Sequence, residues 1–229
     1  MVYDFTSTTE TPRGTYHSAG TIWFDGDSYR AELSADPSRE TDVVISRDRD
    51  ATAMQLNAEE KSWTWRHRMN DVRSSKLFLW PMTPSFVAGP VRIEQRLEGK
   101  TQLEGFKVVK HRITVTFRVD TPGTKGNAVP GTLKTTTRIW TVESLPRLPV
   151  PLRLRTGYPA VDNKLTAHFE KIEGMVVWHE MEVTRIIDGG PPMSEKTTTA
   201  VRNIRQLDID PTRFEVPAEF AFRGAQEMK

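Results

Sequence analysis

Apolar and polar residues alternate one by one along the clearest segments of this chain. Between residues 109 and 119 every second position is apolar apart from one histidine, and the positions between them are polar or charged. A β-strand points successive side chains to opposite faces, so this segment predicts a strand with one buried and one solvated face. Residues 175–187 show the same alternation. Half-buried strands of this kind are typical of antiparallel sheets.

Turn residues separate several further strands. Asp25-Gly26 lies between two short segments with aromatic and apolar residues, which predicts a tight hairpin. Polar turns at residues 47–50 and 57–61, and a loop rich in glycine and proline at 121–130, indicate consecutive strands joined as a meander. We expect one strand to follow the turn at 47–50 and to end at residue 56. Further strands are expected at residues 2–6, 62–67, 91–98, 132–142, 194–207 and, briefly, 214–216.

One segment has helical periodicity. Val161, Leu165, Phe169 and Ile172 form an apolar stripe within residues 160–172, with Pro159 before it and Gly174 after it. Residues 69–79 show a poorer helical pattern, which predicts a second, weaker helix. One or two helices cannot build a hydrophobic core alone, so they must pack on the sheet. We therefore expect a mainly β protein, a strongly curved antiparallel sheet or incomplete β-barrel with one or two helices on its concave face, in a single domain of residues 1–229.

Composition removes several classes of function. The 229 residues include no cysteine, which excludes thiol nucleophiles, disulfides and cysteine-based zinc sites. The formal net charge is only +2 and the two signs are mixed along the chain, which argues against nucleic acid as a partner. No apolar run approaches the roughly 20 residues that cross a bilayer. We expect a protein that is at most peripheral to a membrane.

The histidines are the natural place to look for metal or acid–base chemistry, and none of the five has metal-ligand spacing. Nucleophile, phosphate-loop and dinucleotide motifs are also missing from the sequence. We therefore predict no metal, no cofactor and no enzymatic activity. His111 and His179 differ from the rest because each interrupts an otherwise apolar face. Such histidines are more often hydrogen-bonded core residues than ligand-binding groups.

Several segments in order carry a family resemblance. They are residues 25–30, 42–48, 54–57 followed by Trp63, 103–108, and 209–220 at the end. Together they resemble the lipoprotein-carrier-like (LolA/LolB-like) group, which includes periplasmic members of unknown function. The resemblance implies an incomplete barrel whose apolar concave face is covered by helices and accepts acyl chains, with no catalytic residues.

The same resemblance implies a periplasmic protein whose signal peptide has been removed, although a cytoplasmic location stays open. Two features of the group are missing here: a leading helix before the first strand, and a lipobox cysteine for a lipid anchor. Both absences weaken the case for lipoprotein transfer itself.

The two alternating segments predict a candidate ligand-binding surface. If both turn their apolar sides inward, one concave wall contains His111, Ile113, Val115, Phe117, Val177, His179 and Met181. This wall favours a binding or carrier module for a hydrophobic ligand such as a lipid, an acyl chain or a lipoprotein. The alternative is a protein-interaction or envelope-sensing module, with an envelope protein as the partner, and an enzyme is the weakest possibility. A cavity-free core that simply contains both histidines also stays open.

Overall fold

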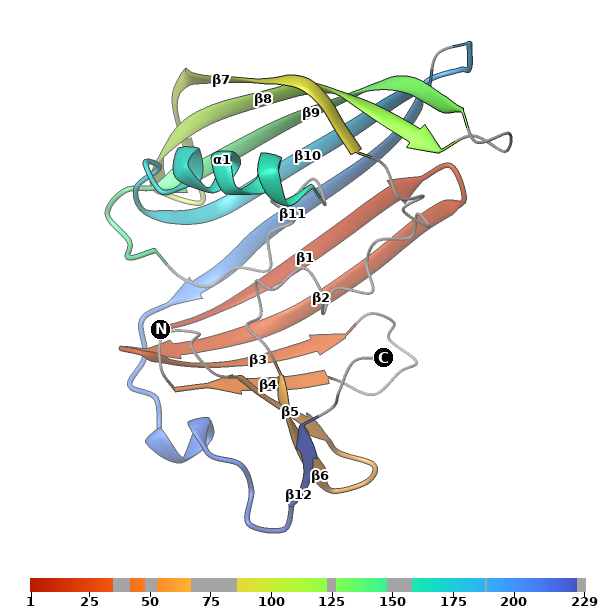
Figure 1. The fold of residues 1–229 in the computed structure, drawn as a ribbon. Helices are drawn as coiled ribbons and strands as arrows, with labels where there is room; N and C mark the ends of the chain where they lie inside the picture. Colours follow the sequence, from red (N-terminus) through yellow and green to blue (C-terminus); the bar gives the residue numbers. More distant parts are fainter. Residues whose placement is uncertain are drawn as a thin grey trace. The chain divides into compact units, whose positions relative to one another are not determined.

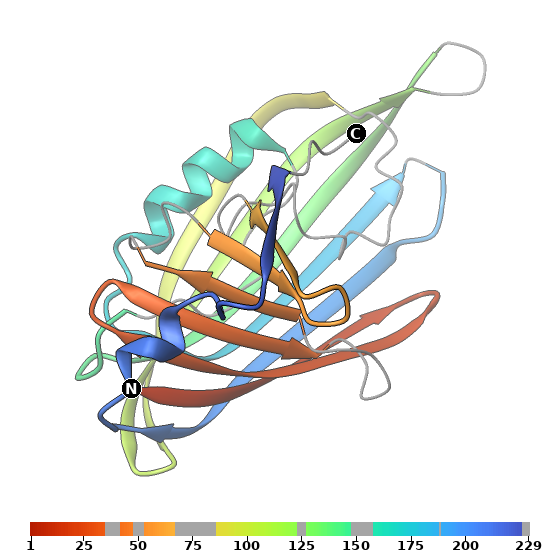
Figure 2. The ribbon, with the colours of Figure 1, turned by 90° about the horizontal axis from the view of Figure 1, so that it is seen from below.

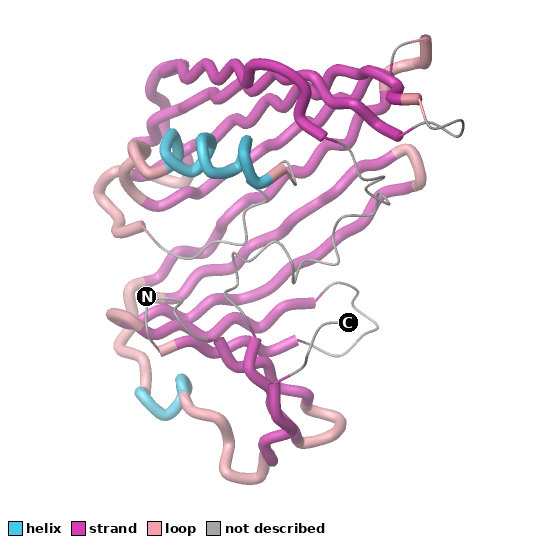
Figure 3. The backbone as a smooth tube through the Cα atoms, viewed as in Figure 1, coloured by secondary structure: helices cyan, strands magenta, loops and turns pink. Residues whose placement is uncertain are grey.

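Strands make up most of the chain. The computed structural model describes residues 1–34, 42–47, 53–66, 86–122, 127–147, 158–187 and 189–225 (Figures 1 and 3). The predicted helix at 69–79 and His67 lie outside these residues. In chain order the elements are β1 (Val2–Thr11), β2 (Gly14–Asp25), β3 (Ser28–Ser34), β4 (Asp42–Ser46), β5 (Ala53–Asn57), β6 (Ser62–Arg66), β7 (Phe86–Leu103), β8 (Phe106–Pro122), β9 (Ala128–Val142), α1 (Pro159–Phe169), β10 (Met175–Ile187), β11 (Met193–Arg205), the 3-10 helix η2 (Pro211–Phe214) and β12 (Ala221–Ala225).

The strands form a sheet in the order β12-β6-β5-β4-β3-β2-β1-β11-β10-β9-β8-β7. Two meanders account for this order, one from β1 to β6 and one from β7 to β11, and β1 pairs with β11 where they meet. Among the described strands, β12 and β7 stand at opposite ends of the order and do not pair with each other, so these strands do not close the sheet into a barrel. The prediction of a mainly β, largely antiparallel and incomplete barrel is confirmed.

The chain divides into two compact units. One contains residues 1–8, 16–76 and 200–229, and the other contains residues 9–15 and 77–199. β1, β2 and β11 each contribute residues to both units. The expectation of a single domain stays a prediction.

In the unit of residues 77–199, α1 packs on the sheet (Figures 1 and 2). Pro159 opens the helix, where its missing N–H is not needed, and the N–H groups of Val161 and Asp162 donate to the carbonyl oxygen of Tyr158 at 2.9 Å. The predicted stripe is buried, and together with β8 and β9 residues it forms one core cluster: Ile113, Val115, Phe117, Val119, Leu133, Ile139, Tyr158, Val161, Leu165, Phe169 and Ile172. The helix ends at Phe169, three residues before the predicted end, and a turn then brings the N–H of Ile172 to the carbonyl of Phe169.

The other unit has its own small core. Ile45, Met54 and Leu56 of β4 and β5 are buried against Phe214 of η2. The predicted Asp25-Gly26 hairpin joins β2 to β3 with Asp25 paired to Ser28, and Gly26 takes the positive φ of 57° that the tight turn requires.

The predicted strand at residues 214–216 is wrong. Pro211 and Asp210 start the 3-10 helix η2 instead, because proline fixes a helical φ and the Asp210 carboxylate accepts a 2.9 Å hydrogen bond from the N–H of Thr212. The final strand, β12, begins at Ala221 and pairs in parallel with β6. The other predicted strands are present with shifted ends, and β10 has the predicted bounds.

Candidate functional site

The side of β8, β9 and β10 that carries the residues packed beneath α1 is called the inner face. Alternation and register define it: His111 pairs with Ile139, which pairs with His179, and Ile113 pairs with Thr137, which pairs with Met181. Directly paired residues of neighbouring strands project to the same side of a sheet. The inner face comprises His111, Ile113, Val115 and Phe117 of β8, Leu133, Thr135, Thr137, Ile139 and Thr141 of β9, and Val177, His179 and Met181 of β10.

The seven residues predicted from sequence all lie on this face. Six are buried and His111 is half-buried. Ile113, Val115 and Phe117 belong to the core cluster beneath α1, and the ring of Phe117 packs edge-on against Tyr158 with 5.2 Å between ring centroids. Their role in binding a ligand stays a prediction.

His179 is the most unusual of the seven. Its side chain is fully buried, and neither ring nitrogen has a hydrogen-bond partner among the described residues. Burial lowers the pKa of His179 to about 4, although the nearby charge of Glu180 acts in the opposite direction. The ring is therefore neutral near pH 7 and presents one donor and one acceptor, both unsatisfied.

His111 differs from His179 in its surroundings. Burial lowers its pKa, with the charge of Glu143 opposing the shift. Ile139 stands between the two histidines in the cross-strand row, so their backbones are separated by two strand spacings, or roughly 10 Å. The two rings are thus separate polar groups on the face, and they are not arranged to coordinate one metal ion together.

The sequence patterns did not single out three threonines of β9. Thr135, Thr137 and Thr141 are buried on the inner face, and the hydroxyls of Thr135 and Thr141 have no partner in the described part of the chain. The available signal was their spacing at every second position of the predicted strand. Because threonine is a polar residue, however, threonines at buried positions do not produce the apolar alternation that identifies a buried face. Buried polar groups are normally hydrogen-bonded to protein or to water, so each of these is a place for a ligand or water atom.

The inner face consists mainly of apolar side chains. Within the described ranges, no three His, Cys, Asp or Glu residues gather in a group that could hold a metal ion. None of the described helices is long and apolar enough to cross a bilayer. What the face offers is aliphatic and aromatic surface with a few isolated hydrogen-bonding groups, the usual composition of an apolar ligand site.

Comparisons with known proteins find structural neighbours only. No family model matches the sequence, and no curated protein matches it. The structure of PNGF-II is similar with a TM-score of 0.35 and 13% identity over 98% of this chain, which spans only 31% of PNGF-II. A putative outer membrane lipoprotein-sorting protein domain from Vibrio parahaemolyticus has a TM-score of 0.34 and 10% identity, covering 95% of this chain and 90% of the domain.

A third neighbour is the MucA/MucB complex of Pseudomonas aeruginosa, with a TM-score of 0.26 and 8% identity over 90% of this chain and 95% of the matched chain. The structural neighbours thus include a putative outer membrane lipoprotein-sorting protein domain. At these levels of similarity, the residues of this chain have to carry the functional argument.

Proposed function

We propose that this chain is a periplasmic binding or carrier module for a hydrophobic ligand, such as a lipid, an acyl chain or a lipoprotein, and that the ligand lies on the inner face of β8, β9 and β10. The observation that carries the proposal is His179. A fully buried ring with two unpaired nitrogens costs stability unless another molecule supplies the missing partners. A ligand head group would do so.

The residues around His179 suit the rest of an amphiphile. Val177 and Met181 flank it on β10, and Thr135 and Thr141 offer two further unpaired hydroxyls on β9. An apolar chain would lie against the aliphatic side chains while the few polar groups fix its orientation. Because α1 packs against the β8 and β9 residues of this face, the proposal requires the helix to move when a ligand enters.

The proposal is tested by titrating the protein with a fluorescent fatty acid. Saturable binding is expected for the native chain, and Phe117→Asp is expected to abolish it by placing a charge in the wall. Leu207→Asp is the matched control, because Leu207 is exposed and lies outside the inner face.

Two milder variants cover the case in which Phe117→Asp does not fold. Thr135→Val and His179→Leu remove unpaired polar atoms without opening a large cavity, so both are expected to fold while binding the probe more weakly. Absence of saturable binding by the native chain, or unchanged binding by both folded variants, would contradict the proposal.

A further inference from the structure

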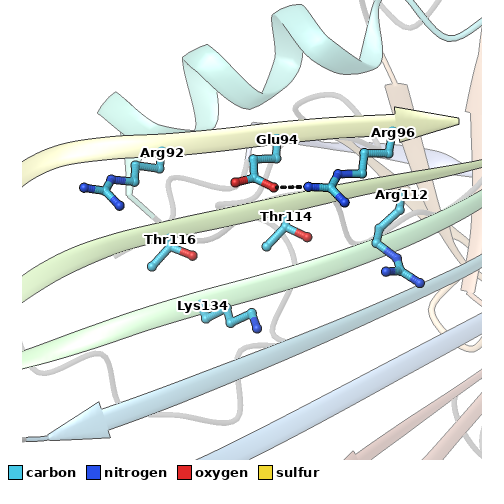
Figure 4. Close-up of a pocket in the computed structure, with 7 residues that line it drawn as sticks. All are labelled: Arg92, Glu94, Arg96, Arg112, Thr114, Thr116 and Lys134. Carbon is cyan, nitrogen blue, oxygen red and sulfur yellow. Dashed lines mark hydrogen bonds and ion pairs between the residues drawn. The ribbon is translucent and has the colours of Figure 1, made fainter.

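The opposite, solvent-facing side of the same strands carries a second feature. A pocket of about 380 Å³ lies over β7, β8 and β9, lined by Arg92, Glu94, Arg96, Arg112, Thr114, Thr116 and Lys134 (Figure 4). These positions alternate with the buried residues Ile113 and Val115, so they point away from α1. We call this feature the cationic pocket.

Strand register arranges its charges at two ends. Arg96 pairs directly with Arg112 across β7 and β8 at one end. At the other end Arg92 pairs with Thr116, which pairs with Lys134 of β9. The ends are four residues apart along β7, or roughly 13 Å at the rise of a strand. Glu94 and Thr114 pair with each other between them.

The cationic side chains of the pocket outnumber the carboxylates that neutralise them. Four cations line it against one carboxylate. Arg96 is paired with Glu94 at 3.2 Å, but both side chains are largely exposed, so water screens the attraction. Arg112 is paired with Glu98 on β7, yet its Nε is buried without a partner in the described chain. Arg92 and Lys134 have no ion-pair partner among the described residues.

Like charges placed directly opposite each other destabilise a sheet. The row containing Arg96 and Arg112 continues to Arg138 on β9. Each of these three arginines already has a carboxylate partner, which is Glu94, Glu98 and Glu180 respectively. Among the described residues, the positive charge that remains without a partner is on Arg92 and Lys134, and the Nε of Arg112 also has no acceptor. A bound anion supplies acceptors to several such cationic groups at once. The pocket is also within the size range of small-molecule sites.

We propose that the cationic pocket binds a ligand with two phosphate groups, one at each cationic end. The ligand is either a soluble organic bisphosphate or the headgroup of a lipid with two phosphates, since both present the same chemistry. This site is independent of the proposed function, because it uses the opposite face of the strands from α1.

The first test uses glucose 1,6-bisphosphate as the probe, with binding followed by calorimetry and by phosphorus NMR. Both phosphate signals are expected to shift or broaden, and added salt should weaken binding. Arg92→Gln/Lys134→Gln, which removes the two unpaired cations, is expected to weaken binding roughly tenfold or more. Lys107→Gln/Arg118→Gln is the control, because it removes the same charge from exposed positions of β8 outside the pocket.

The second arm identifies the source of the phosphates. Cosedimentation with cardiolipin-containing phosphatidylcholine vesicles, lost in Arg92→Gln/Lys134→Gln and kept in the control, would support a lipid headgroup. Binding of the soluble probe without vesicle binding would support a free bisphosphate. No binding of either probe, a response of only one phosphate signal, or equal losses in the two double variants would overturn the proposal.

Discussion

The Nδ1 atom of His168 on α1 donates a 3.0 Å hydrogen bond to Oε1 of Gln95 on β7. This bond ties the last turn of the helix to the strand at the edge of the sheet. Gln95 pairs with Ile113, a residue of the core cluster beneath α1. The contact between His168 and Gln95 is therefore a point at which α1 can be fixed over the inner face or released from it.

Cross-linking α1 to β7 should block binding at the inner face. The chain has no cysteine, so a short bismaleimide will react only at the thiols of the double variant Gln95→Cys/His168→Cys. We expect the fluorescent fatty acid to bind before cross-linking and not after it, because the helix can no longer move. Thr184→Cys/Ser194→Cys joins two exposed hydroxyl positions on β10 and β11 that lie 3.1 Å apart, and its cross-link should leave binding unchanged. Equal binding before and after the α1 cross-link would count against a moving helix.

The free energy of unfolding should depend on pH through His179. Its pKa is about 4 in the folded protein against an ordinary value of 6.5. Between these values the unfolded chain takes up a proton that the folded chain does not, so stability falls as pH drops from about 6.5 toward 4, by a few kcal/mol in total. Urea unfolding at about pH 7 and about pH 4.5 measures the loss, which His179→Leu should reduce. His17→Leu, at an exposed position, should keep the native pH dependence.

Glu180 should also make stability fall at low pH, but as a carboxylate that is needed in its charged form. Burial alone would raise its pKa, but hydrogen bonds from Lys196 and Arg138 hold the pKa of Glu180 below its ordinary value. The stability from this depressed pKa is present above the ordinary value and is lost as pH falls through the folded value. We expect Glu180→Gln to lower the free energy of unfolding at pH 7 by about 1 kcal/mol or less. A variant as stable as the native chain at neutral pH would show that the ion pairs contribute nothing.

Gly174 should tolerate no side chain. It follows α1 with a φ of 83°, and an added Cβ would meet the carbonyl of Val142 and lie 2.8 Å from the Cα of Glu143. Gly189 has nearly the same φ, 82°, but open space around it. Gly189→Ala should therefore cost only the backbone strain, about 1 kcal/mol, whereas Gly174→Ala should cost clearly more in thermal or urea unfolding. Similar losses in both variants would show that the backbone conformation alone matters.

Alternation was sufficient to locate the strands that build the inner face. The one-face apolar pattern around Ile113 and Phe117 is present in β8, and the pattern in β10 gave both of its ends. It was less informative for β7, which was expected over residues 91–98 and is much longer, because register shifts near Ala88 and near Gly99 break the period of two.

The remaining features depend on which strands become neighbours. Arg92, Arg96, Arg112 and Lys134 each look like an ordinary solvent-facing residue in the sequence, and only the register of β7, β8 and β9 gathers them around one pocket. Likewise, His179 looks like a satisfied core histidine until its neighbours are known. Periodicity assigns a face to a residue, but it does not say what stands opposite it.

The edge position of β7 has a consequence for self-association. A long edge strand exposes backbone groups that can pair with a second chain. Here Pro90 lacks an N–H to donate, and the register shifts on either side of Arg92–Leu97 distort the strand. Charged side chains at Arg92, Glu94 and Arg96 further oppose pairing with another copy of β7. Arg92 and Arg96, which line the pocket, are thus also expected to oppose aggregation at this edge of the sheet.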